Sequence, residues 1–116
     1  MNTLREALVE AANPLGLDGI EYVEYATSSP QAAGHVLELM GFRPVARHRS
    51  REATLYRQGS MNVIVNAHAG VVRGGRAPSE QPRISAIALR VRDARAAYAH
   101  VLERGGWEVP MHAQVI

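Results

Sequence analysis

Hydrophobic and polar positions along the chain repeat one pattern twice: a strand-like run followed by a helix-like run. Runs rich in β-branched and aromatic residues, from Ile20 to Thr27 and from Ile84 to Arg92, predict two strands. In the second run Ile87, Leu89 and Val91 alternate with small or charged residues, which predicts a strand with one buried face. Apolar residues at helical spacing follow both runs, so we expect a duplicated strand-plus-helix unit.

The two predicted helices share a four-residue segment and have recognisable ends. His35–Glu38 and His100–Glu103 both read His-Val-Leu-Glu. Residues at i, i+3, i+4 and i+7 form one apolar face in each helix, namely Ala33, Val36, Leu37 and Met40 in the first and Ala94, Ala97, Tyr98 and Val101 in the second. Ser28-Ser29-Pro30 and Asp93 predict the helix starts, and Gly41 and Gly105-Gly106 predict the helix stops.

Three short strands are predicted between the first helix and a linker rich in glycine and proline. They run from Phe42 to Arg49, Thr54 to Gln58 and Asn62 to Ala67, with a turn at Gly59-Ser60. A further strand is expected to start at Trp107 to Val109. The predicted fold class is α+β, with one complete βαβββ module followed by a partial second module. The expected parts are an N-terminal arm (1–18) and one domain (19–116), which divides into the first module (19–70), a linker loop (71–83) and a truncated second module (84–116).

Composition narrows the possible partners. The 116 residues suffice for one domain, and the absence of cysteine excludes disulfides and thiolate chemistry. All 13 basic residues are arginine, and Arg43, Arg47, Arg49 and Arg51 form a cluster that suggests an anion or nucleic-acid patch. Because few aromatic residues accompany it, we interpret the cluster as an exposed strand and expect no nucleic-acid partner. No run is apolar enough for a membrane span or signal peptide, so we expect no membrane association and a cytoplasmic location.

Paired βαβββ modules are the plan of the vicinal-oxygen-chelate fold, which glyoxalases, bleomycin-resistance proteins and extradiol dioxygenases share. Within that group the chain resembles the N-terminal domain of bacterial 4-hydroxyphenylpyruvate dioxygenases. The resemblance runs from about Asn13 to Trp107 and rests on five segments in the same order: Asn13–Tyr25, Met40–Ser50, Thr54–Gly59, Asn62–Ala67 and Ile87–Val91.

The resemblance implies an Fe(II) dioxygenase of tyrosine catabolism, which converts 4-hydroxyphenylpyruvate and O2 into homogentisate and CO2. Its iron is held by two histidines and a glutamate in the family's C-terminal domain. This chain resembles the N-terminal domain, so we expect no catalytic residue, cofactor or metal within it and a structural role in building a homo-oligomer. The catalytic C-terminal domain is the expected partner if the natural chain is longer.

In metal-bearing modules of this fold, the opening strand supplies a ligand, and that position falls at Gly19 and at Ala86 here. Neither side chain binds iron. Glu21 and Arg90 share the faces of these two residues, which suggests the hypothesis of an ion pair in place of the metal. The remaining metal candidates are His48 and His68, which with Glu21 or Glu24 would form a histidine–carboxylate site of no recognised ligand spacing.

Two alternative functions follow from other classes of protein. One is a stand-alone small-molecule-binding dimer of the glyoxalase and bleomycin-resistance type, in which an open sheet edge promotes association. The other is an independent metalloenzyme, which the residues Gly19 and Ala86 disfavour.

Overall fold

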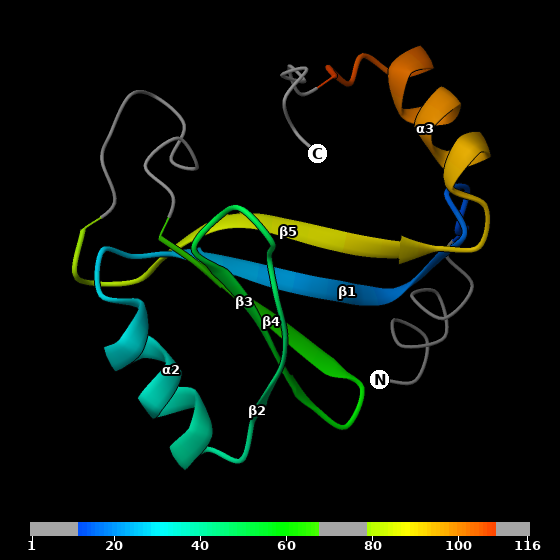
Figure 1. Cartoon of the computed structure of the whole chain (residues 1–116). Helices are drawn as coiled ribbons and strands as arrows, with labels where there is room; N and C mark the ends of the chain where they lie inside the picture. Colours follow the sequence, from blue (N-terminus) through cyan, green and yellow to red (C-terminus); the bar gives the residue numbers. More distant parts are fainter. Residues whose placement is uncertain (1–11, 68–78, 109–116) are drawn as a thin grey trace, which may run out of the picture. The chain divides into compact units, whose positions relative to one another are not determined.

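The computed structural model describes residues 12–67 and 79–108 (Figure 1). The elements in these residues follow the predicted order of a βαβββ module and then a second strand and helix. Their bounds are β1 (Leu17–Ala26), α2 (Pro30–Leu39), β2 (Arg43–Arg47), β3 (Ala53–Gln58), β4 (Met61–Asn66), β5 (Arg83–Val91) and α3 (Ala94–Glu103). The prediction of an α+β chain with one complete module and the start of a second is confirmed. The predicted linker is only partly described, because residues 68–78 lie outside these ranges.

The strands form one sheet in the order β2-β3-β4-β1-β5. Strands β2, β3 and β4 are antiparallel neighbours, whereas β4 pairs with β1 in parallel. The turn predicted at Gly59-Ser60 joins β3 to β4, and Gly59 adopts φ 59°, which a two-residue hairpin favours. Strand β5 completes the sheet beside β1 as an edge strand.

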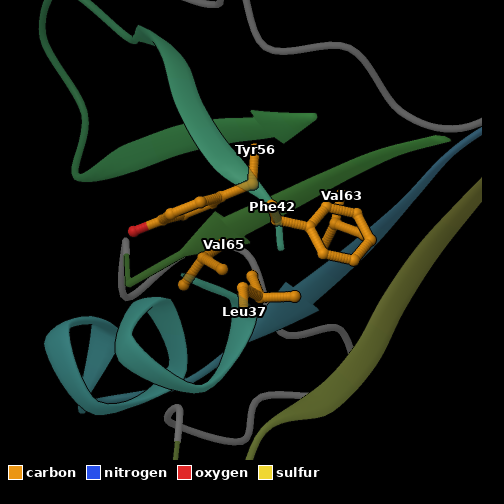
Figure 2. Close-up of a cluster of buried hydrophobic side chains, with 5 residues drawn as sticks. All are labelled: Leu37, Phe42, Tyr56, Val63 and Val65. Carbon is orange, nitrogen blue, oxygen red and sulfur yellow. The ribbon is translucent and has the colours of Figure 1, made fainter. Parts of the chain in front are cut away.

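The Cα positions divide into two compact units, and α2, β2, β3, β4 and most of β1 and β5 belong to the unit Ile20–Leu89. In this unit α2 packs on one face of the sheet through Leu37, Phe42, Tyr56, Val63 and Val65 (Figure 2). Because these five side chains are each at most 9% exposed, they form the hydrophobic core of the described residues.

The start of α2 is fixed by backbone and threonine hydrogen bonds. Pro30 occupies the first turn as predicted, but the Ser29 side chain makes no capping hydrogen bond. The fully buried Thr27 instead donates from Oγ1 to the Glu80 carbonyl (2.7 Å) and accepts from the Ser29 N–H (3.0 Å). At the other end, Gly41 follows the helix with φ 103°, a left-handed conformation that confirms the predicted stop.

The second unit contains residues 12–19 and 90–108 and carries α3. Asp93 caps this helix as predicted, because its Oδ1 accepts a hydrogen bond from the Ala96 N–H at 3.1 Å. The apolar stripe of α3 buries no residue among those described, and Tyr98 is 52% exposed. The prediction of a strand that starts at Trp107 is wrong for the two described residues, Trp107 and Glu108, because neither is part of a strand. Trp107 is 94% exposed and has no strand partner there.

The start of β1 and the burial of β5 differ from what the sequence predicts. Strand β1 begins at Leu17, earlier than predicted, because the Asn13 side chain bonds both the N–H and the carbonyl of Leu17 and starts the strand there. Ile87 and Leu89 were expected to be buried but are 55% and 54% exposed. The reason is that β5 is an edge strand, and no described element covers these two side chains.

No helix in residues 12–67 and 79–108 has the length and apolar content of a membrane span.

Candidate functional site

The sheet face opposite α2, which we call the open face, carries a carboxylate held by two neighbouring strands. Ser85 of β5 donates from Oγ to Glu24 Oε1 at 2.8 Å, and Oγ also lies 3.2 Å from the Glu24 carbonyl oxygen. Asn66 of β4 donates from Nδ2 to Glu24 Oε2 at 3.2 Å. Glu24 is half-buried and Asn66 is 5% exposed. Both carboxylate oxygens therefore accept hydrogen bonds, which fixes the position of the charge on β1, between β4 and β5.

A second polar row crosses the same face toward the β3–β4 hairpin. Arg57 donates from Nε to Asn62 Oδ1 at 2.8 Å, and Asn62 donates from Nδ2 to the Glu21 carbonyl at 3.2 Å. Between the two polar rows lie Leu55 and Ile64, which are register partners on β3 and β4. The open face thus has an apolar centre between a carboxylate at one end and a guanidinium at the other.

At the β2 end of the open face a small pocket has a volume of about 220 Å³. Its lining is mostly apolar and consists of Ala46, Arg47, His48, Ala53, Thr54, Leu55 and Ile64. Pockets for small-molecule ligands usually measure about 300–1,000 Å³. This pocket is therefore smaller than expected for a protein that sequesters a drug-sized molecule.

The predicted arginine cluster is divided by an irregularity in β2. The register between β2 and β3 shifts between Pro44 and Ala46, so one extra residue enters β2. Arg43 consequently lies opposite Arg57, on the open face, whereas Arg47 lies opposite Thr54, on the α2 face. Arg47 joins Arg49 and Arg51 around a second pocket of about 400 Å³, which we call the basic pocket.

The metal candidates do not come together in the described residues. His48 accepts hydrogen bonds at Nδ1 from the backbone N–H groups of Ser50 (3.1 Å) and Arg51 (3.2 Å), so this lone pair is occupied. Glu21 is exposed on β1, and His68 lies outside the described residues. Among residues 12–67 and 79–108 no three His, Asp or Glu side chains form a group able to hold a metal ion. The ion pair between Glu21 and Arg90 stays a prediction.

The sequence named Glu24 only as a possible metal ligand beside the histidines, and it did not single out Asn66 and Ser85. Strict alternation along β1 places Glu24 opposite to Val23 and Tyr25, whose register partners Val63 and Val65 are core residues. That pattern identifies Glu24 as a residue of the open face. Its partners Asn66 and Ser85 come from segments 42 and 61 residues away, so only the strand order identifies them.

Comparisons with known proteins agree on one family. The family profile described as "Hydroxyphenylpyruvate dioxygenase, HPPD, N-terminal" matches residues 11–116. The chain is similar to "Hemolysin VllY" of Vibrio vulnificus, with 41% identity over 87% of this chain and 29% of the relative. It is also similar to a 4-hydroxyphenylpyruvate dioxygenase of a Pseudomonas species, with 39% identity over 88% of this chain and 28% of the relative.

Two further similar proteins are a dehydratase and a fusion protein. The chain is 37% identical to a 3-dehydroshikimate dehydratase of Pseudomonas putida, over 69% of this chain and 13% of the relative. Among solved structures it resembles a "xylose isomerase-like TIM barrel/4-hydroxyphenylpyruvate dioxygenase fusion protein", with a TM-score of 0.66 and 28% identity. That match covers 91% of this chain and 19% of the fusion protein. The chain therefore spans less than a third of each of these proteins.

Proposed function

Because the chain belongs to the family of hydroxyphenylpyruvate dioxygenase N-terminal domains, we propose that it is the non-catalytic domain of a longer dioxygenase-like protein. The longer protein would act on 4-hydroxyphenylpyruvate in tyrosine breakdown and would hold Fe(II) in a separate C-terminal domain. The coverage of 28% of the Pseudomonas relative carries this proposal, because it leaves most of such a protein outside the chain. The cytoplasm is the compartment we expect for it.

The residues of this chain do not fit the iron that the family implies. The fold family places a ligand on each opening strand, and Gly19 and Ala86 stand at those positions. Gly19 has φ 107°, so most other residues, histidine included, would be strained there. The carboxylate of Glu24 already accepts hydrogen bonds from Asn66 and Ser85. These side chains are therefore unsuited to hold iron.

A structural role accounts best for the surfaces that the described residues leave exposed. Strand β5 is a sheet edge, and its Ile87 and Leu89 are each more than half exposed. Unpaired edges and exposed apolar residues both favour association with another domain or subunit. In the proposal this surface supports the catalytic domain or builds a homo-oligomer.

Metal titration of the purified chain tests the non-catalytic role. Isothermal titration with Fe(II) under anaerobic conditions, and with Co(II) as a spectroscopic substitute, should give no stoichiometric binding. A variant with His48→Ala and His68→Ala should behave in the same way. Stoichiometric binding that this double variant abolishes would overturn the proposal and restore the histidine site.

The similarity to a dehydratase and to a fusion protein favours a second candidate function. Both the 3-dehydroshikimate dehydratase and the TIM-barrel fusion protein contain a region similar to this chain. The same domain would then support a protein that carries a different catalytic domain. The two candidates differ in which activity a longer natural chain shows, whereas both require the chain itself to lack iron.

A further inference from the structure

The basic pocket lies where the start of α2 faces the loop between β2 and β3. Its volume of about 400 Å³ falls within the range of about 300–1,000 Å³ that is usual for small-molecule sites. All of its lining residues belong to the unit Ile20–Leu89. They are Pro30, Gln31, Arg47, His48, Arg49, Ser50, Arg51, Glu52, Ala53, Thr54 and Tyr56.

Positive charge dominates the lining. Arg47, Arg49 and Arg51 contribute three guanidinium groups, which stay charged at every physiological pH, against the single carboxylate of Glu52. Within the part of the chain that the structure describes, none of the three arginines forms an ion pair. Like charges that converge on one pocket repel each other, so an anionic ligand between them would relieve the repulsion and gain charge-assisted hydrogen bonds.

The loop that carries these arginines is held in place before any ligand binds. The ring atom Nδ1 of His48 accepts hydrogen bonds from the backbone N–H groups of Ser50 and Arg51. The backbone N–H of His48 donates to the Ala53 carbonyl at 2.8 Å. The Ala67 N–H also donates to the Glu52 carbonyl at 2.8 Å, which ties the loop to the end of β4. Because Nδ1 is an acceptor, the neutral His48 ring carries its proton on Nε2 and adds a donor to the lining.

The other walls suit a ligand with an apolar body. Tyr56 lines the pocket and is 8% exposed, and Pro30 and Ala53 add carbon surface. The first turn of α2 has no side-chain cap, so its free N–H groups add positive potential at the Gln31 wall. A bare inorganic ion would fill only part of a space of this size.

We infer that the basic pocket binds a small organic anion, in which a carboxylate or phosphate group faces the arginines and a compact apolar body lies against Tyr56. This site needs no iron and no catalytic domain, so it stands apart from the function proposed above. Either anionic group satisfies the same guanidinium geometry, since arginine donates two parallel hydrogen bonds to carboxylates and phosphates alike.

The test uses the complete 116-residue chain and three aromatic probes: phenyl phosphate, phenylacetate and the uncharged 2-phenylethanol. Titration followed by ¹H–¹⁵N NMR should show saturable binding of at least one of the two anions, with shifts at Gln31, Ser50 and Arg51. The neutral probe should not bind at these residues. The tighter of the two anions identifies the headgroup, and inorganic phosphate should bind more weakly than phenyl phosphate.

Arginine variants distinguish specific binding in the basic pocket from general attraction of anions to surface charge. Arg49→Gln and Arg51→Gln should each raise the Kd of the bound anion roughly tenfold or more, because each removes a charged hydrogen-bond donor. Arg43→Gln is the matched control, since Arg43 lies on the same strand as Arg47 but on the opposite face. Arg43 and Arg49 are exposed and Arg51 is partly exposed, so unchanged thermal unfolding should show that all three variants are folded.

Three outcomes would overturn the inference. One is the absence of saturable binding of both aromatic anions at millimolar concentrations. Another is an equal loss of affinity in Arg43→Gln and the two pocket variants, which would indicate general surface charge. The last is much tighter, length-dependent binding of single-stranded oligothymidine at the same residues, which would identify a nucleic-acid surface instead.

Discussion

The α-carbon of Gly34 in α2 lies against the phenol ring of Tyr56 in β3, so a methyl group at position 34 would overlap the Tyr56 hydroxyl. Both residues are buried, and Tyr56 belongs to the core on which α2 packs. Glycine within a helix normally costs about 1 kcal/mol relative to alanine. The close approach of the helix to the tyrosine ring explains why glycine stands at this position.

Gly34→Ala should therefore lower the free energy of unfolding, although alanine is the better helix former. Overpacking a core typically costs about 1–3 kcal/mol, and the ring of a buried tyrosine has little room to move. Urea unfolding followed by circular dichroism measures the change. In the background of Tyr56→Phe, which removes the overlapping hydroxyl, the same substitution should cost at least 0.5 kcal/mol less, roughly the threshold at which contacting residues show coupling. An equal cost in both backgrounds would show that the two residues do not conflict.

The hydrophobic core predicts unequal effects for two leucines of the same helix. Leu37 is 9% exposed and Leu39 is 74% exposed. Leu37→Ala should lower the free energy of unfolding by about 2–5 kcal/mol, because it removes buried methyl groups and leaves a cavity. Leu39→Ala should change it by less than about 0.5 kcal/mol. Similar effects of both substitutions in denaturant unfolding would mean that α2 does not pack on the sheet through Leu37.

Tyr98 should titrate differently from an ordinary tyrosine. Its hydroxyl donates a hydrogen bond to the Glu108 carboxylate, and this acceptor and its negative charge raise the pKa of Tyr98 above the usual value of about 10. The folded state thus binds this proton more tightly than the unfolded state. The resulting stabilisation is complete below about pH 10 and is lost as the pH rises through the folded pKa.

Glu108→Gln checks this interaction, because it removes the charge and keeps a hydrogen-bond acceptor. The pKa of Tyr98, followed through the ¹³Cζ resonance by NMR, should fall toward the ordinary value in the variant. Tyr98→Phe assigns the resonance. A pKa of Tyr98 that is the same with and without the carboxylate would contradict the contact.

Local signals in the sequence predicted the elements well. The turn at Gly59-Ser60, the helix stop at Gly41 and the cap at Asp93 each depend on a few neighbouring residues, and the structure confirms them. Element order follows from the same local patterns. Burial on β5 was predicted wrongly because alternation shows which residues share a face but not whether another element covers that face.

The candidate sites depend on contacts that the sequence does not encode locally. Glu24 meets Asn66 and Ser85 only because β4 and β5 flank β1. The arginine cluster looked continuous, but the irregularity in β2 moves Arg43 to the face opposite Arg47. A single extra residue in a strand reverses every side chain after it, and the hydrophobic pattern of so short a strand is too weak to reveal it.

Oxygen uptake by the purified chain, supplied with Fe(II), ascorbate and 4-hydroxyphenylpyruvate, tests the central claim most directly. A full-length relative such as the Pseudomonas 4-hydroxyphenylpyruvate dioxygenase serves as the positive control. The account predicts that the chain consumes no more oxygen than free Fe(II) with the same substrate and forms no homogentisate. Sustained turnover with homogentisate as product would contradict it and would mean that this chain assembles an iron site of its own.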